Sequence, residues 1–279
     1  TISMSLKDKV DYDCTEQFLM SIGGCVFPVS FEIIGTFEKT TVQLVCREAD
    51  LYHLKPQFEA YFPDAVVYDE GEDLNCLATG SKETVLMDFA LVQEFMRPIR
   101  TFKGFEPDPL TGIFGALENL EKDEIGIFQV LFQPARHSWA ESIARSVTDW
   151  EGKSFFADSP DMQHLAKEKI QKPLFAVCLR IASQSPENVR AWEIASALTG
   201  GLAPVSRSES NELYHLDNDG YDDSVHAEDI CSRQSRRSGM LLNSEELVSL
   251  VHPPSHSIRA TKLRRELKKT GVKVIVVEP

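Results

Sequence analysis

Oxygen-rich side chains are concentrated in one short stretch of this 279-residue chain, and calcium binding is the chemistry they would support. Segment 217–223 reads Asp-Asn-Asp-Gly-Tyr-Asp-Asp. In an EF-hand loop with Gly220 as the sixth residue, His215 would be first and His226 twelfth, where carboxylates are required. A solvated loop is therefore the better interpretation, and no metal site is predicted here.

Two histidines form the second candidate for metal or acid–base chemistry. His252 and His256 flank the sequence Pro253-Pro254-Ser255. The prolines prevent the two rings from sharing a helical i, i+4 face, and the sequence places no third ligand beside them. A structural role is the better interpretation.

The sequence contains no complete motif for nucleotide binding or for nucleophilic catalysis. Gly152-Lys153-Ser154 resembles the end of a phosphate-binding loop, but the first glycine of that motif would be position 147, which is valine. Ser30 and Ser183 lie in or beside expected strands without the Gly-x-Ser-x-Gly turn of a hydrolase nucleophile. The sequence therefore predicts no catalytic and no cofactor-binding residue. Three tryptophans fit core or interface positions better than base stacking: Trp139, Trp150 and Trp192.

Charge is the one feature with a functional interpretation. The chain carries 43 acidic against 29 basic residues, a formal charge of −14, which opposes DNA binding by the chain as a whole. Segment 259–273 reverses this sign and could contact DNA, an anionic membrane or a neighbouring subunit, although a solvated charged face fits equally well. Its basic residues are Arg259, Lys262, Arg264, Arg265, Lys268, Lys269 and Lys273.

The number and spacing of the cysteines bear on whether the protein is found in a reducing or an oxidising compartment. The six cysteines contain no Cys-x-x-Cys pair and suit no zinc site. Cys46 and Cys178 lie within apolar runs, where a free thiol packs as a small core residue. The wide spacing favours a reducing compartment, although an even number of cysteines would also allow disulfides. No apolar run approaches the roughly 18 residues that a membrane span needs.

The elements that would position these residues predict an α+β fold with two similar sheet-and-helix halves and mixed sheets. The first half, 1–150, contains a hairpin of strands 26–34 and 40–47. The continuously apolar runs 127–132 and 175–181 predict central buried strands, one in each half. The second half, 151–279, is expected to hold a helix closed by Gly200-Gly201 and a polar loop over 204–239. It is also expected to end with a strand at 272–277.

Several short motifs, taken in order, resemble a known class of proteins. They include Pro98-Ile99-Arg100-Thr101 and Asp108-Pro109-Leu110, then an acidic turn and a strand that ends Gln133-Pro134. The others are Thr15–Leu19, Val29–Ile33, Tyr61–Ala65, Lys172–Ile181, Asn211–Leu213 and Leu242–Ser255. In this order they are similar to the region ahead of the motor domain in bacterial conjugative DNA-transfer ATPases. That class includes the coupling ATPases of type IV secretion and HerA–FtsK-like translocases.

The resemblance implies a non-catalytic accessory or assembly domain. Its partners would be an ATPase motor domain and neighbouring subunits in an oligomer, and it would lie in the cytoplasm, at the cytoplasmic face of the inner membrane. The family's Walker A loop does not occur in these 279 residues, and Lys273–Val277 departs from the family's pattern. Two alternatives stay open: a free-standing adaptor, and an enzyme of unknown type with its site between the two halves.

Overall fold

The computed structural model describes most of the chain, namely residues 2–3, 11–68, 71–72, 74, 77, 82–105, 107–135, 139–148 and 161–263. The helices are α1 (Tyr12–Ser21), α2 (Glu48–Tyr61), α3 (Thr111–Glu118), α4 (Trp139–Val147), α5 (Met162–Ile170), α6 (Asn188–Ser206), α7 (Asp223–Ser232) and α8 (Ser244–Val248), with 3-10 turns η1 (Ile22–Gly24) and η3 (Phe102–Gly104). The strands are β1 (Ile2–Ser3), β2 (Val29–Thr36), β3 (Thr40–Val45), β4 (Val66–Val67), β5 (Glu83–Leu91), β6 (Ile125–Pro134), β7 (Leu174–Ser185), β8 (Leu213–His215) and β9 (Met240–Asn243).

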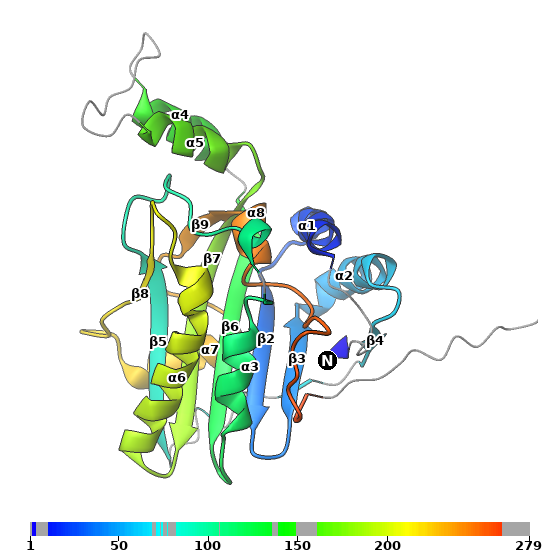
Figure 1. The fold of residues 1–279 in the computed structure, drawn as a ribbon, viewed down its shortest axis with the longest axis vertical. Helices are drawn as coiled ribbons and strands as arrows, with labels where there is room; N and C mark the ends of the chain where they lie inside the picture. The colour runs from blue at the N-terminus through cyan, green and yellow to red at the C-terminus, as the bar shows by residue number, and fades with distance from the viewer. Residues whose placement is uncertain are drawn as a thin grey trace, which may run out of the picture.

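These strands form one sheet, and the α+β class is confirmed (Figure 1). The strand order is β4-β1-β3-β2-β6-β7-β5-β8, and β9 also pairs with β7. Every pairing between the named strands is antiparallel, so the expectation of mixed sheets is corrected. The segments 1–150 and 151–279 both contribute central strands, because β7 lies between β6 and β5. The boundary near residue 150 therefore does not separate two sheets.

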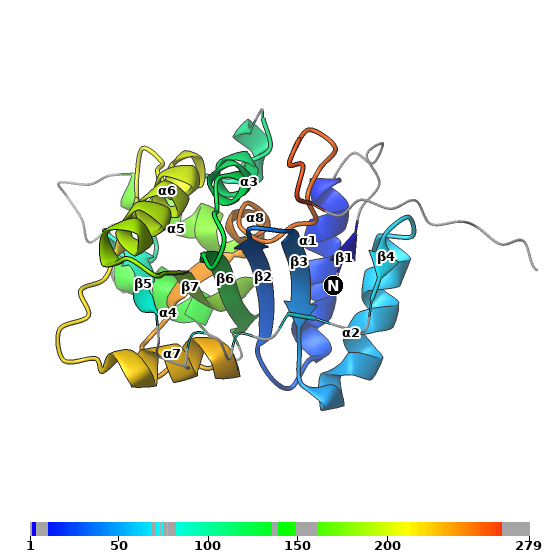
Figure 2. The same cartoon turned by 90° about the horizontal axis from the view of Figure 1, so that it is seen from below.

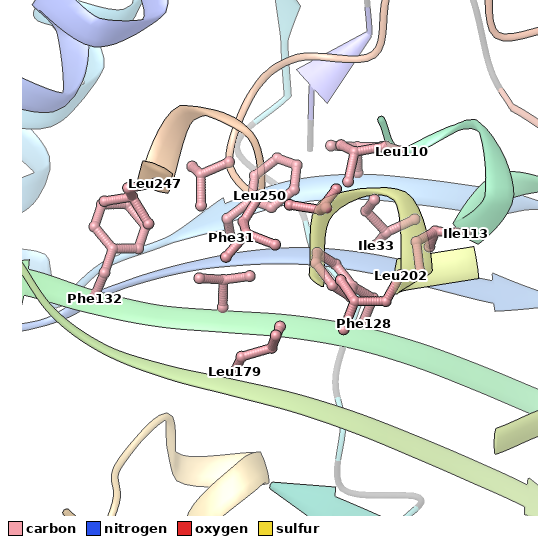
Figure 3. Close-up of a cluster of buried hydrophobic side chains, with 14 of the residues drawn as sticks. Phe31, Ile33, Leu110, Ile113, Phe128, Phe132, Leu179, Leu202, Leu247 and Leu250 are labelled. Carbon is pink, nitrogen blue, oxygen red and sulfur yellow. The ribbon is translucent and has the colours of Figure 1, made fainter. Parts of the chain in front are cut away.

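The two faces of the sheet are covered differently. Helices α3 and α6 pack on one face, whereas α7 lies on the opposite face (Figure 2). The main core fills the α3–α6 face, where side chains from β2, β6 and β7 meet residues of α3, α6 and α8 (Figure 3). Phe128 and Val177 are 0% and 1% exposed, which confirms that the two apolar runs are central buried strands. A second, smaller apolar cluster lies under α7 and includes Ile127, Ala182 and Ile230.

Two expectations about the second half are corrected. Helix α6 does not end at Gly200-Gly201 but continues to Ser206. The reason is packing: a Cβ atom on Gly201 would lie 2.5 Å from the backbone carbon of Gly112 in α3, so Gly201 serves a close helix contact rather than a helix end. The segment 204–239 is also not a loop throughout, since it contains β8 and α7. Much of the buried face of α7 is polar, so apolar periodicity does not reveal the helix.

The ends of several helices are fixed by their sequence. Asp222 caps α7, because its carboxylate accepts hydrogen bonds from the backbone N–H groups of Ser224 and Val225. Asn243 and Glu246 form a capping box at the start of α8. A linker is expected over 148–160, and of it residues 149–160 lie outside the described residues, as does the expected strand 272–277. Within the described part of the chain, no helix has both the length and the apolarity needed to cross a membrane.

Candidate functional site

A row of five polar side chains crosses the sheet on the α7 face. In the register of the strands, Gln43 faces Glu32, Glu32 faces Gln129, Gln129 faces Arg180, and Arg180 faces Asp88. These residues come from β3, β2, β6, β7 and β5, and all five are buried. Side chains directly opposite each other on neighbouring antiparallel strands are close enough to interact. The fold thus aligns five polar groups from distant parts of the sequence; we call them the polar row.

Glu32 is the most heavily bonded member of the polar row. Its carboxylate accepts hydrogen bonds from Gln43 Nε2 at 2.7 Å and from Gln129 Nε2 at 2.9 Å. Arg233, in the left-handed C-cap of α7, donates to both carboxylate oxygens at 3.0 Å. The hydroxyl of Ser30 adds a bond at 2.8 Å. A buried carboxylate is tolerated only with such partners, so Glu32 fixes α7 to the sheet.

Asp88 forms the other end of the polar row. Its Oδ1 atom lies 3.0 Å from Arg180 Nε and 3.2 Å from His226 Nε2, and its Oδ2 atom lies 3.4 Å from Arg237 Nη1. Burial favours a raised pKa for Asp88, but His226 and Arg180 outweigh burial and hold this pKa below its usual value. Asp88 is therefore a fixed anion among cations, not a proton donor at neutral pH.

A second buried carboxylate, Asp229 on α7, extends the network. Arg236 Nη1 donates to its Oδ1 atom at 2.6 Å, and the hydroxyl of Tyr221 donates to its Oδ2 atom. The ring of Tyr221 stacks on His226 with centroids 4.7 Å apart. Burial, followed by the hydrogen bond to Asp229, raises the pKa of Tyr221 to about 12. The phenol therefore stays protonated at neutral pH.

A pocket of about 650 Å³ opens beside the polar row. Its floor includes Leu131 and Cys178, which pair with each other two positions away from the Gln129–Arg180 pair on β6 and β7. The segment that follows α7 forms one wall. The other wall comes from Phe27 and from the end of β3.

A separate buried pair links Asp108 to His252. Nε2 of His252 lies 3.1 Å from Asp108 Oδ1, and Nδ1 donates to the carbonyl oxygen of Val248 at 2.8 Å. Burial alone would raise the pKa of Asp108, but His252, the side chain of Ser255 and the backbone N–H of Leu110 lower it to about 2. The ring of His252 and the carboxylate of Asp108 are both enclosed. The pair is therefore a structural contact, in agreement with the role expected for His252.

The remaining sequence candidates are dispersed. His256 is exposed. Within the described residues, no group of three or more histidine, cysteine or acidic side chains could hold a metal ion. Ser183 donates to the carbonyl oxygen of Ala191 at 2.7 Å. In the acidic stretch 217–223, Asp222 serves as the cap of α7. Trp139 and Trp192 are 39% and 50% exposed, so neither is a core residue, and Trp150 lies outside the described residues.

Only the beginning of the basic segment 259–273 is described. Arg259 is exposed. Lys262 is held at the end of α3 and just beyond it, since its backbone N–H donates to Glu118 at 3.1 Å and its Nζ donates to the carbonyl oxygen of Leu120 at 3.1 Å. The other members, Arg264, Arg265, Lys268, Lys269 and Lys273, lie outside the described residues.

Sequence reasoning did not identify the polar row, although a signal was present. Glu32, Gln129 and Arg180 each interrupt an otherwise apolar strand. A polar residue at such a position must find a buried partner, so it marks a site of buried polar pairing. The partners of these three residues are set by the order of the strands and by α7, and the sequence predicts neither.

Comparison with known protein families gives a match over part of the chain. Residues 23–154 match a family described as a domain of unknown function, DUF8128. The matched region contains β2, β3, β5 and β6, and therefore four of the five residues of the polar row: Gln43, Glu32, Gln129 and Asp88. No curated protein matches the chain significantly.

Proposed function

We propose that this chain is a non-catalytic accessory domain that assembles with the motor of a DNA-translocating or conjugative-transfer ATPase. The observation that carries the proposal is the position of the motifs that resemble that class. Segments around residues 16, 98–101, 108–110, 172–173 and 242–255 are far apart in the sequence. In the fold, hydrogen bonds join residues of these segments around α8, and we call this group of contacts the α8 junction.

Glu246 is the centre of the α8 junction. It is fully buried and pairs with Lys169, whose Nζ lies 2.6 Å from Oε2. Its Oε1 atom accepts a hydrogen bond from the backbone N–H of Ile99 at 2.8 Å. One side chain therefore connects α5, the Pro98–Thr101 motif and the start of α8.

The N-terminal motif joins the same junction. Glu16 on α1 accepts hydrogen bonds from Lys172 Nζ at 2.9 Å and from the hydroxyl of Ser244 at 2.5 Å. The backbone N–H of Ser244 donates to the carbonyl oxygen of Pro173 at 2.9 Å. The motifs at positions 16, 172–173 and 244 are thus bonded directly.

Asn211 bonds to the segment just ahead of the Pro98–Thr101 motif. Its Nδ2 donates to the carbonyl oxygens of Glu94 and Arg97 at 3.3 and 2.8 Å, and its Oδ1 accepts from the N–H of Gln93 at 2.9 Å. The hydroxyl of Ser208 donates to the carbonyl oxygen of Pro98 at 2.8 Å. These polar groups are committed to internal bonds, which favours a role in holding a shape for a partner over a role in catalysis.

An experiment with two measurements tests the proposal. Purified chain is expected to show no ATP hydrolysis, and chemical cross-linking in the bacterial cells that encode it is expected to join it to an ATPase with a Walker A loop. ATP turnover that a point substitution within this chain abolishes would overturn the non-catalytic assignment. Cross-links confined to proteins without a motor would overturn the motor partnership and favour a free-standing adaptor.

The location that fits this proposal is the cytoplasm, at the cytoplasmic face of the inner membrane, with neighbouring subunits completing an oligomer. The basic segment 259–273 would supply the electrostatic contact to DNA, an anionic membrane or the motor. Such a contact weakens with salt, because counterion release and screening both scale with the charges neutralised.

A further inference from the structure

The pocket beside the polar row has an apolar floor. Val45, Leu131 and Cys178 lie on the α7 face of β3, β6 and β7, and all three line the pocket. Cys178 and Ala176 are only partly buried, so the floor is open to an occupant. The volume of about 650 Å³ falls within the range of roughly 300–1,000 Å³ that is usual for small-molecule sites.

The charge of the pocket walls is opposite to that of the protein. Three arginines line it, namely Arg47, Arg233 and Arg237, and no aspartate or glutamate of the described part of the chain does. In a chain with 43 acidic and 29 basic residues, a hollow with only cationic side chains among its charged groups selects against cations and favours anions.

Two of these arginines are held in place from behind. Arg233 is fixed by its bidentate pair with Glu32, and Arg237 donates to the carbonyl oxygen of Asp217 at 3.0 Å while its guanidinium lies 4.3 Å from the centre of the Tyr221 ring. Guanidinium groups fixed in this way lose little conformational entropy when they bind a ligand. The polar row thus pre-organises one wall of the pocket.

Arg47 supplies the charge that is not balanced. It is exposed, and it makes no ion pair with any residue in the described ranges. Its guanidinium lies 5.7 Å from the centre of the Phe27 ring. The carboxylate of Asp50 fixes the backbone at Phe27, because it accepts hydrogen bonds from the N–H groups of Val26 and Phe27 at 2.8 and 2.9 Å. The charge of Arg47 is therefore held at the rim, beside an aromatic surface.

Buried guanidinium nitrogens beside the pocket have unused donors. Nη2 of Arg180 and Nη1 of Arg237 are buried and make no hydrogen bond to any described residue, although Arg237 Nη1 lies 3.4 Å from Asp88 Oδ2. Arg180 lies two residues from Cys178 on the same face of β7. Buried donors without an acceptor are unfavourable, and an anionic head group supplies acceptors.

We propose that this pocket binds an organic anion with an apolar body and a single carboxylate, sulfonate or phosphate head. The body lies on the floor of Val45, Leu131 and Cys178, and the head lies between Arg47 and the wall formed by Arg233 and Arg237. This binding activity is independent of the partnership with a motor.

A pair of fluorescent dyes tests the requirement for an anionic head. The probe is 8-anilinonaphthalene-1-sulfonate, and N-phenyl-1-naphthylamine has the same apolar body without the sulfonate. The sulfonate dye is expected to bind more tightly than the neutral dye. Arg47→Ala is expected to lower the affinity for the sulfonate dye about tenfold, as for loss of one charge-assisted hydrogen bond. The affinity for the neutral dye is expected to stay unchanged. Arg145→Ala on α4, where the side chain is 77% exposed, is the matched control.

Thiol labelling places the bound dye. Cys178 lines the pocket and Cys14 on α1 does not. Bound sulfonate dye is expected to slow alkylation of Cys178 by N-ethylmaleimide, read peptide by peptide by mass spectrometry, and to leave Cys14 unaffected. Equal binding of the two dyes, an Arg47→Ala variant that binds like wild type, or unprotected Cys178 would each overturn the proposal.

Discussion

Gly112 on α3 and Gly201 on α6 pack backbone against backbone, so that a Cβ atom added to Gly112 would lie 2.7 Å from the Cα atom of Gly201. This contact brings the two helices together over the main core. It also explains why a Gly-Gly pair, which usually ends a helix, lies within α6 here.

The glycine contact predicts opposite effects for two neighbouring substitutions. Gly201→Ala is expected to lower the free energy of unfolding by about 1–3 kcal/mol, because the neighbouring group is rigid backbone. Gly200→Ala meets no atom within 4 Å and is expected to raise it by up to about 1 kcal/mol, because alanine favours the helix. Urea unfolding followed by circular dichroism measures both. A stable Gly201→Ala variant would show that the helices can separate without loss.

The polar row predicts a large effect of removing one charge. Arg180→Met leaves Asp88 buried beside fewer cations and is expected to lower the free energy of unfolding by about 3 kcal/mol. Replacing Asp88 by leucine in the same chain is expected to recover part of that loss, because the uncompensated charge is then removed. Chemical denaturation of the single and double variants checks this. A loss below about 1 kcal/mol for Arg180→Met would mean that the pair contributes little.

The central strands predict that a buried charge prevents folding. Phe128→Asp and Val177→Asp each place an unpaired carboxylate in the core, at a cost of several kcal/mol against a total stability of about 5–15 kcal/mol. Val189→Asp on α6 is the control, since that side chain is 70% exposed. Thermal unfolding monitored by circular dichroism distinguishes them. Cooperative unfolding of the Phe128→Asp or Val177→Asp variant would contradict the burial of these strands.

The lowered pKa of Asp108 predicts a pH-dependent contribution to stability. A carboxyl with a pKa of about 2 in the folded chain and a normal pKa when unfolded stabilises the fold above about pH 4 by about 2 kcal/mol. That contribution is lost as the pH falls from about 4 to about 2. Asp108→Asn is therefore expected to reduce stability at pH 7 and to differ less from wild type at pH 3. Urea titrations across this range test it, and a difference that stays constant with pH would exclude the linkage.

The basic segment predicts salt-sensitive binding. Replacing Arg264, Arg265, Lys268 and Lys269 by serine is expected to preserve folding and to reduce affinity for whichever anionic partner is used. Salt series of binding to DNA and to anionic vesicles, for wild type and variant, measure this. If neither surface binds at low salt, the DNA and membrane interpretations are both wrong, and the segment is a subunit contact or a solvated face.

The sequence alone determined the elements whose cause is local. Apolar runs identified β6 and β7 as central strands, and the hairpin of β2 and β3 followed from two strands joined by a short link. The start of α8 also has a local cause, because the capping box of Asn243 and Glu246 is a pattern within four residues. The α+β class followed from the number and kind of these elements.

The tertiary structure decided whatever depends on distant residues. Strand order places Arg180 between Gln129 and Asp88, and that neighbourhood cannot be read from positions so far apart in the chain. Helix α7 escaped sequence reasoning because its buried face carries His226 and Asp229, whose burial is stable only beside the polar row. The pocket likewise exists only because one sheet unites strands from both parts of the chain. Local patterns set what each segment can form, and long-range pairing of buried polar groups sets where it lies.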